Sequence, residues 1–227
     1  LGVCHHDSPD RRGVDVAFLY SKDRFQIIGT NYFTVKTEDP NFITRDHFLM
    51  TGIVDGTDTV HFIVMHWPSK LGGEKRSMPK RAAAAQTARH IADSILTTNI
   101  NANIIFMGDF NDNPTAKSLK EYLKPKNKVK EVEKGDLFNP MWKMFQEGIG
   151  TYAYRDTWDV IDQIVISSNL VNPVSNTYKF VSAKVFRKNF MLSQTGSYIG
   201  YPFRTYAAGS YQGGYSDHFP VYIILEK

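Results

Sequence analysis

Apolar residues along this chain fall into short runs that are separated by polar, turn-forming segments. The run at residues 104–107, Ile-Ile-Phe-Met, stops at Gly108 and is followed by Asp109 and Asn111. Such a run predicts a buried strand whose C-terminal end presents a carboxylate and an amide. Open α/β sheets bind ligands outside the carboxyl ends of their strands, so the other segments are interpreted around this one.

Two further apolar runs, at residues 47–54 and 60–66, predict neighbouring antiparallel strands. The residues between them, Asp-Gly-Thr-Asp-Thr at 55–59, have the composition of a hairpin turn. Pro68 ends the second strand and leaves His66 near its tip. A lone histidine at that position is either structural or catalytic, and it becomes a catalytic candidate only if other polar groups converge on it.

Residues 80–98 carry apolar side chains at helical spacing, which predicts a helix with Ser77 or a neighbour as its N-cap and Pro79 in its first turn. Arg81 is expected on the face away from the core. The helix connects the strand that ends at His66 to the strand at 104–108, so the pattern predicts a strand–helix–strand unit with parallel strands.

The rest of the chain adds strands and short helices, and a 227-residue chain of this kind is most simply one α/β domain. Strands are predicted at 14–20, 158–167, 178–186 and 219–225, short helices at 115–123 and 137–145, and a long Gly-, Tyr- and Ser-rich loop at 189–214.

One carboxylate, Asp162, interrupts the otherwise apolar run at 158–167. A buried carboxylate costs several kcal/mol unless it is paired, so Asp162 requires a partner. Asp217 and His218 directly precede the last strand. An imidazole of His218 that is held in one tautomer by Asp162 can take a proton from water or stabilise a transition state.

The composition, with 42% hydrophobic and 22% charged residues, is that of a soluble globular protein, and no apolar run approaches the roughly 18 residues that span a bilayer. The net charge of +4 comes largely from residues 117–136, where seven lysines face four acids. This segment is either a solvated helix and loop or an arm that binds nucleic acid. Cys4 is the only cysteine, which excludes an internal disulfide and a thiolate-rich zinc site.

Two features near the start of the chain have alternative interpretations. The adjacent residues His5 and His6 beside Asp7 suggest a metal site, but neighbours on an extended chain point to opposite faces, which argues against one. Arg12, just before a predicted strand, fits bidentate phosphate binding, and a surface ion pair explains it almost as well.

The sequence Gly108-Asp109-Phe110-Asn111, followed by Trp158 to Ile164 and then by Ser216-Asp217-His218-Phe219-Pro220-Val221, resembles the motifs of the endonuclease/exonuclease/phosphatase superfamily. The resemblance covers nearly the whole chain. It implies one catalytic domain over residues 1–227, built as a four-layer α/β sandwich in which two packed mixed β-sheets are flanked by helices. It also implies a hydrolase that cleaves phosphoester bonds by attack of activated water on phosphorus.

Carboxylates and an amide are hard oxygen ligands, which suits Mg²⁺ and also Mn²⁺. By position, the resemblance implies that Asp109 positions or deprotonates the attacking water. It also implies that Asp109 and Asp217 take part in metal binding. The resemblance also implies that Asn111 binds the phosphate and helps to shape the metal site.

The resemblance also implies that His218 contacts the scissile phosphate and is oriented by Asp162. His66 matches a histidine that acts as an acid or as a phosphate contact. Arg12 and Thr151 match less closely, as candidates for binding the phosphate or a second metal.

The chain departs from the family pattern at its start, because a strand bearing an asparagine and a strand ending in Gln-Glu do not precede Leu1. The domain is therefore expected to lack its N-terminal portion and the main metal-binding glutamate, to bind Mg²⁺ weakly, and to associate with its own N-terminal segment. Without a Met or a leader sequence the localisation is not determined.

The substrate is left open among nucleic acid, phospholipid and small phosphoesters. Neither a nucleophilic-serine elbow nor a P-loop occurs. Two alternatives remain: a catalytically impaired domain of the same fold that binds an anionic partner, and a plain structural α/β domain.

Overall fold

The computed structural model describes all 227 residues, and its centre is a six-stranded sheet. Its strands, in spatial order, are β3 (Phe25–Phe33), β4 (His47–Val54), β5 (Asp58–His66), β6 (Asn103–Asp109), β10 (Asp162–Ser167) and β7 (Leu137–Phe138). Only β5 and β6 are parallel, and the helix α1 (Glu74–Thr98) connects them. The predicted strand–helix–strand unit and the predicted hairpin of β4 and β5 are therefore present.

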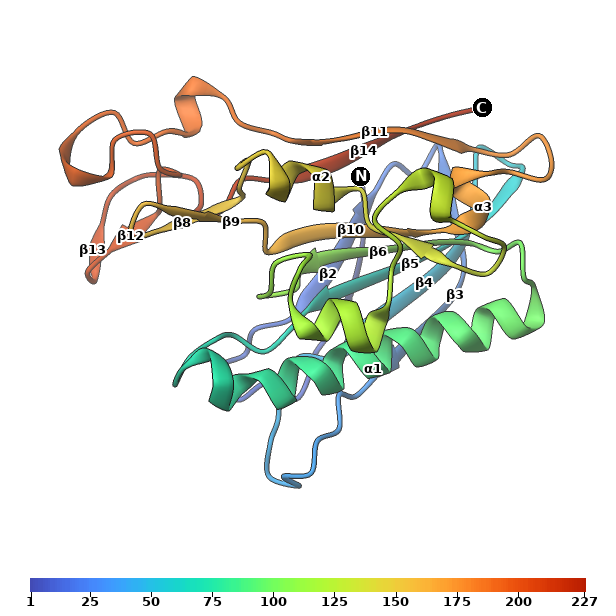
Figure 1. Cartoon of the computed structure of the whole chain (residues 1–227), viewed down its shortest axis with the longest axis horizontal. Helices are drawn as coiled ribbons and strands as arrows, with labels where there is room; N and C mark the ends of the chain where they lie inside the picture. Colours follow the sequence, from blue (N-terminus) through green and yellow to red (C-terminus); the bar gives the residue numbers. More distant parts are fainter.

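The helix α1 covers one face of this sheet (Figure 1). Its alanines are buried, and Ala84 and Ala88, which are completely so, join one core cluster with Ile104 and Phe106 of β6. Small side chains let the helix lie close to the sheet. A short π-type helical segment, Ser118–Leu123, packs against α1.

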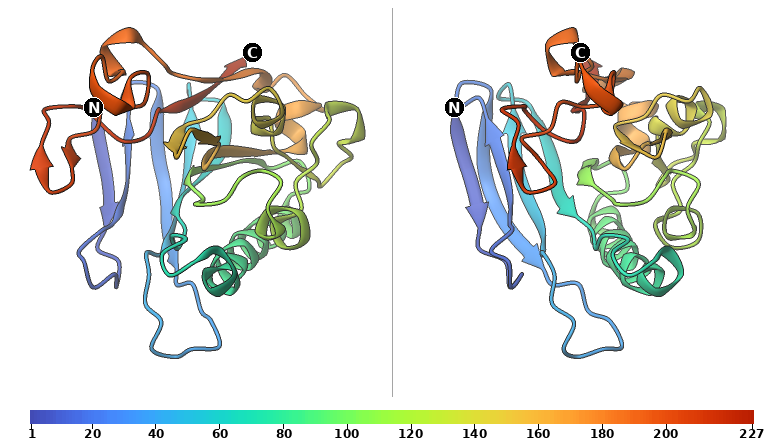
Figure 2. Two further views of the ribbon diagram at one scale, coloured as in Figure 1. Left: turned by 60° about the vertical axis from the view of Figure 1, so that its left-hand side comes forward. Right: turned by 90° about the vertical axis from the view of Figure 1, so that its left-hand side faces the viewer.

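Two antiparallel strand pairs lie on the opposite face of the sheet (Figure 2). They are β1 (Gly2–His6) with β2 (Val16–Tyr20), and β11 (Lys179–Val185) with β14 (Val221–Glu226). An apolar groove of about 410 Å³ separates the two pairs, with Phe62, Met107 and Ile164 among its lining residues. The expected α/β sandwich is confirmed, with its second layer formed by two separate pairs rather than by one continuous sheet.

The other elements are short. They are α2 (Met141–Gln146), α3 (Ser168–Val171), β8 (Tyr152–Tyr154), β9 (Thr157–Asp159), β12 (Tyr206–Ala207), β13 (Ser210–Tyr211) and 3-10 turns at Val129–Glu131, Asn189–Met191 and Gly196–Tyr198. No helix has the length and apolar character needed to cross a membrane.

The helix α1 differs from its prediction at the N-terminal end. It begins at Glu74 with Gly73 as N-cap, and Ser77 is buried inside the helix, where its hydroxyl donates to the Gly73 carbonyl at 2.7 Å. Pro79 therefore lies within the helix and removes one backbone hydrogen bond. Arg81, expected on the outer face, is completely buried.

Other differences reflect contacts that a local pattern does not reveal. The strands β1 and β3 were not predicted, because β1 is short and partly polar and the side chains of β3 are mostly exposed. The predicted helix at 137–145 divides into β7 and α2, and the run at 158–167 divides into β9 and β10. In the lysine-rich segment, Lys117, Lys126 and Lys128 pair with nearby acids, as solvated surface residues do.

Candidate active site

Three of the predicted site residues form one row across the sheet. His66 is in register with Asp109 in the parallel β5–β6 pair, and Asp109 is in register with Asp162 in the antiparallel β6–β10 pair. Residues in register on neighbouring strands point to the same face, so the three side chains lie together at one end of the sheet. We call His66, Asp109 and Asp162 the polar row.

His218, from the segment before β14, reaches the end of this row. Its Nδ1 lies 2.9 Å from Oδ2 and 3.1 Å from Oδ1 of Asp162. A carboxylate accepts, so Nδ1 donates and the other ring nitrogen is left to face a ligand. The partner that Asp162 requires is therefore His218, 56 residues further along the chain.

The backbone at the end of β6 makes this arrangement possible. Gly108 has φ of +139°, and a Cβ at this position would lie 1.8 Å from the carbonyl oxygen of Met65. Asn111 also has a positive φ, +52°, and its backbone N–H donates to Asp109 Oδ1 at 2.7 Å. The side-chain amide of Asn111 donates to the Trp67 carbonyl at 2.9 Å, which leaves its Oδ1 without a partner.

Burial and neighbouring charges shift the pKa values of the site in opposite directions. Burial, with the charge of Asp162 beside it, raises the pKa of Asp109 to about 7. Burial and the nearby cations Arg45 and Arg12 lower the pKa of His66 to about 4, so this imidazole is neutral at pH 7. Its Nε2 lies 3.4 Å from Asp109 Oδ2.

His218 has the opposite charge state. Burial alone would lower the pKa of His218, but the hydrogen bond and charge of Asp162, with the charges of Asp109 and Asp217, raise it to about 9. The site therefore contains one neutral imidazole, one imidazolium and a carboxyl group that titrates near neutral pH. Such separated protonation states are typical of acid–base sites.

Two residues beside the polar row, Asp10 and Arg45, were not found by the sequence analysis. Arg45 is buried, and its guanidinium contacts Asp10 Oδ2 at 3.0 Å and donates to the Trp67 carbonyl at 2.7 Å. The same carbonyl accepts the Asn111 amide, so Arg45 helps to fix the end of β5 against the end of β6. The only sequence signal was a polar triplet, residues 44–46, directly before a buried strand.

Arg12 binds Asp10 through two parallel hydrogen bonds of 3.1 Å from Nε and Nη2. Arg12 thus forms an ion pair, which is one of the two alternatives that the sequence left open for it. Its side chain is 62% exposed, which leaves part of the guanidinium accessible for a further anion. The predicted contact with phosphate stays a prediction.

The second carboxylate after β6, Asp112, is structural. It is buried, its Oδ2 lies 2.7 Å from Nε of the buried Arg81, and it accepts the Ser118 hydroxyl at 2.6 Å. The interpretation of Arg81 as an outward residue was wrong because this ion pair, which joins α1 to the loop after β6, is invisible to helical periodicity.

Thr151 and Asp217 lie at the edges of the site in different ways. Thr151 is fully buried, and its hydroxyl accepts the backbone N–H groups of Ile161 and Asp162, each at 3.3 Å. The backbone carbonyl of Thr151 accepts the backbone N–H of Phe219, the residue next to His218. Asp217 is exposed and close enough to influence His218. The predicted phosphate and metal contacts of these two residues stay predictions.

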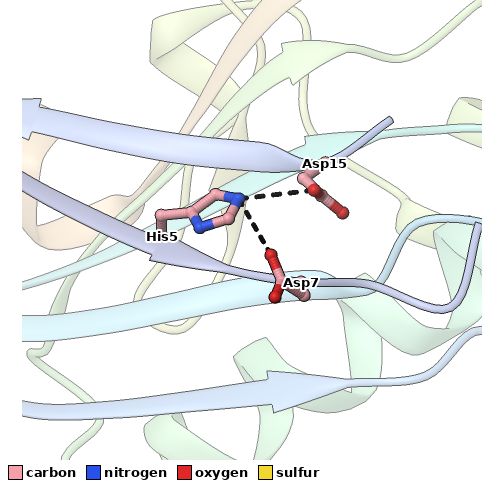
Figure 3. Close-up of side chains that lie close together, drawn as sticks. All are labelled: His5, Asp7 and Asp15. Carbon is pink, nitrogen blue, oxygen red and sulfur yellow. Dashed lines mark hydrogen bonds and ion pairs between the residues drawn. The ribbon is translucent and has the colours of Figure 1, made fainter. Parts of the chain in front are cut away.

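The histidine pair at the start of the chain does not form a joint site. His5 lies near Asp7 and Asp15, at 3.6 and 3.3 Å from their carboxylate oxygens (Figure 3). His6 points elsewhere, toward Asp46 at 3.3 Å, and stacks on Tyr32. The alternation of a strand thus separates the two imidazoles, as expected.

The site residues fit a hard divalent cation. Carboxylate oxygens of Asp109 and Asp162 lie within 4.8 Å of each other and of a ring nitrogen of His218, and Asn111 adds a free amide oxygen. Two carboxylates this close repel each other, and after burial the charge of Asp162 is the next cause of the raised pKa of Asp109. A cation beside them would offset that repulsion. Carboxylate and amide oxygens are the ligands that Mg²⁺ prefers.

At its strand ends the α/β sandwich holds two carboxylates, an oriented imidazolium and a neutral imidazole, which are the groups that acid–base catalysis uses. The family model of the Endonuclease/Exonuclease/phosphatase family matches residues 1–227, and the chain belongs to this family.

Solved structures share the fold at low sequence identity. A mannosyl-6-phosphatase of Bacteroides thetaiotaomicron is 19% identical, with a TM-score of 0.57, 100% of this chain covered and 78% of that chain. TDP2 of D. rerio with a single-strand DNA product is 11% identical, with a TM-score of 0.54 and coverages of 91% and 70%. No curated protein matches significantly in sequence.

Proposed function

We propose that this protein is a Mg²⁺-dependent hydrolase that cleaves a phosphoester bond by attack of activated water on phosphorus. The observation that carries the proposal is the polar row of His66, Asp109 and Asp162 in one register line, with His218 hydrogen-bonded to its end. Family membership supports phosphoester chemistry in general. The metal and the substrate belong to the proposal.

Asp109 is the group that takes the proton from water. A pKa of about 7 lets this carboxylate be deprotonated in a large fraction of molecules at neutral pH while remaining a useful base. Asn111 is held beside Asp109 by its backbone hydrogen bond and keeps a free amide oxygen. Its role is to help bind the phosphate and the cation.

The two histidines have different roles because their charge states differ. His218, an imidazolium fixed by Asp162, donates a charged hydrogen bond to a phosphoryl oxygen and stabilises the charge that develops there. His66 is neutral and therefore serves as a neutral hydrogen-bond donor to the phosphate rather than as a general acid in the ligand-free protein. Asp162 positions His218.

A bound Mg²⁺ would be held by Asp109 and Asn111, with Asp217 as a further ligand, and would supply charge neutralisation at the phosphoryl oxygens. Mn²⁺ fits the same oxygen donors. Arg12, whose guanidinium is partly free, is proposed to add a bidentate phosphate contact.

The charges near the row favour a small phosphoester over a polynucleotide. Apart from the imidazolium of His218, the cations that influence the polar row are Arg12 and Arg45, and both are bound to Asp10. Binding to a nucleic acid strand relies on many free cations along its backbone. Among the structural neighbours both kinds of chemistry are named, a mannosyl-6-phosphatase and TDP2 with a DNA product.

The proposal is tested by measuring product release from sugar phosphates, a nucleotide, a phospholipid and plasmid DNA, with Mg²⁺ and with EDTA. His218→Ala is expected to lower turnover about 100-fold or more, since it removes a charged donor to the phosphate. His90→Ala, at an exposed position on α1, is the matched control and should keep full activity.

The alternative, an impaired domain that binds an anionic partner, predicts no Mg²⁺-dependent release from any substrate in this panel. Turnover that persists in EDTA, or that is unaffected by His218→Ala, would contradict the mechanism.

A further inference from the structure

A cavity of about 440 Å³ lies beside the polar row, and Arg12 is the one predicted site residue that lines it. Three segments enclose it: the turn between β1 and β2, the long loop between β3 and β4, and the region from Pro68 to the first turns of α1. Figure 2 shows the loop between β3 and β4 projecting beyond the sheets.

The cavity adjoins the polar row through Arg45. This residue lines the cavity, and its guanidinium also donates to the carbonyl of Trp67, the residue after His66. Arg12 lines it as well, and the charges of both arginines reach His66. A ligand bound at the polar row could therefore extend into the cavity.

The lining has an excess of positive charge. It includes four cations, Arg11, Arg12, Arg45 and Lys80, and two carboxylates, Asp10 and Asp39. Asp10 is engaged by Arg12 and Arg45. Arg11 and Lys80 make no ion pair or hydrogen bond, and the Lys80 ammonium lies 4.5 Å from the ring centroid of Phe42. Two cations of the cavity are thus without an anionic partner.

A phosphate group, which offers only acceptor oxygens and negative charge, suits these cations. Arg11 and Arg12 are exposed and Lys80 is half-buried, so their charged groups are accessible to a ligand in the cavity. The hydroxyl of Thr44 and Nε of Arg45 also lack an acceptor, but both atoms are closed to solvent and are therefore out of reach of such a ligand.

We propose that this cavity is a second anion subsite, which binds a phosphate group of a substrate that carries another phosphate at the polar row. The assignment of the cavity to the substrate rests on the proposed function, whereas its capacity to bind phosphate does not. The substrate class is then a small molecule with two phosphates, such as a sugar bisphosphate.

The first experiment measures binding of inorganic phosphate by isothermal titration calorimetry. Phosphate binding is expected to persist in His218→Ala, because this substitution changes the group at the end of the polar row and none in the cavity. Binding is expected to weaken about tenfold in Lys80→Ala or Arg11→Ala, which is the effect of losing one charged hydrogen bond. Lys75→Ala, at an exposed position of α1 outside the cavity, is the matched control and should bind as the wild type. Binding that neither Lys80→Ala nor Arg11→Ala weakens would overturn the subsite.

The second experiment compares kcat/KM for glucose 1,6-bisphosphate and glucose 6-phosphate, which differ by one phosphate. The wild type is expected to prefer the bisphosphate about tenfold, and Lys80→Ala to remove most of that preference. The ratio cancels any general loss of active protein. Equal kcat/KM values in the wild type, or a preference unchanged in Lys80→Ala, would show that the cavity does not bind the substrate.

The two experiments separate the two proposals. Failure of every phosphoester to be hydrolysed would contradict the proposed function, and the calorimetry would still decide whether the cavity binds phosphate.

Discussion

At the scale of single residues, the site depends on one glycine and one imidazole–carboxylate pair. The backbone of β6 passes so close to β5 that Gly108 has no room for a side chain. The pair of His218 and Asp162 sets the charge of the group that would meet the phosphate. Both features can be tested by conservative substitutions.

Gly108→Ala is expected to destabilise the fold by about 3 kcal/mol or more, because it adds a clash with the Met65 carbonyl to a backbone conformation that L-residues rarely adopt. Chemical denaturation with urea measures the change. Gly29→Ala is the control, since a Cβ there meets nothing within 4 Å, and its effect should stay within about 0.5 kcal/mol. Equal effects of the two substitutions would refute the steric argument.

Asp162→Asn is expected to lower the pKa of His218 from about 9 to near or below its ordinary value of 6.5. The substitution removes the hydrogen bond and charge that raise the pKa most and leaves burial, which lowers it, with the smaller influence of Asp109 and Asp217. The imidazole would then be largely neutral at pH 7. An NMR titration of the metal-free protein measures this pKa, and a value unchanged from the wild type would contradict the proposed orientation of His218 by Asp162.

At the scale of elements, polar contacts fix how α1 lies on the sheet. The Arg81–Asp112 ion pair joins the helix to the loop after β6, and both side chains are almost completely buried. From β4, Nε2 of His47 donates to the Ala84 carbonyl of the helix at 2.8 Å. These contacts fix the position of the helix relative to the strands that carry the site.

Asp112→Ala is expected to cost about 3–5 kcal/mol, because it leaves the charge of Arg81 buried without a partner. Asp93→Ala breaks the exposed Arg89–Asp93 pair of the same helix and should cost no more than about 0.5 kcal/mol. The difference between the two in thermal or urea unfolding isolates the effect of burial. A similar cost for both variants would mean that the buried pair does not anchor the helix.

His47 is expected to make stability depend on pH. Burial, which outweighs its hydrogen bond to Ala84, lowers the pKa of His47 to about 4, below the unfolded value of 6.5. The unfolded chain therefore binds a proton first as the pH falls, and stability decreases between pH 6.5 and pH 4, by about 3 kcal/mol from this group.

The test compares the free energy of unfolding of the wild type and His47→Gln across this range. Glutamine can donate to Ala84 but does not titrate, so its curve should be flatter. Parallel curves would assign the pH dependence to other groups.

At the scale of the whole molecule, the polar row exists only because of the sheet's topology. A parallel crossover brings His66 beside Asp109, and an antiparallel strand from much later in the chain brings Asp162 beside them. His218 arrives from the second layer. Asp109, which the charge of Asp162 disfavours in its ionised form, is one of the groups proposed to bind Mg²⁺.

Addition of Mg²⁺ is expected to stabilise the wild type by about 1 kcal/mol at a concentration five times the dissociation constant, because the folded chain binds the ion and the unfolded chain does not. Asp109→Asn should abolish this response without lowering the stability of the metal-free protein, since it also removes repulsion with Asp162. Thermal unfolding with Mg²⁺ and with EDTA measures both effects. A full Mg²⁺ response in Asp109→Asn would place the ion elsewhere.

The sequence by itself determined the elements whose cause is local and the motifs that carry the chemistry. The run ending at Gly108 predicted the buried strand β6, helical spacing predicted most of α1, and the motifs at 108–111 and 216–221 led to the family that the whole chain matches. These features follow from side-chain periodicity and turn chemistry within a few residues, which are visible along the chain.

Tertiary structure alone decided how those elements form a site. The partners Asp10 and Arg45 are 35 residues apart in the chain, and Arg81 of α1 pairs with Asp112 of the loop after β6. No local sequence pattern connects the members of either pair. The register that aligns His66, Asp109 and Asp162 depends on packing between strands. The same packing shifts the pKa values of the site, because burial and the approach of distant charges exist only in the folded chain.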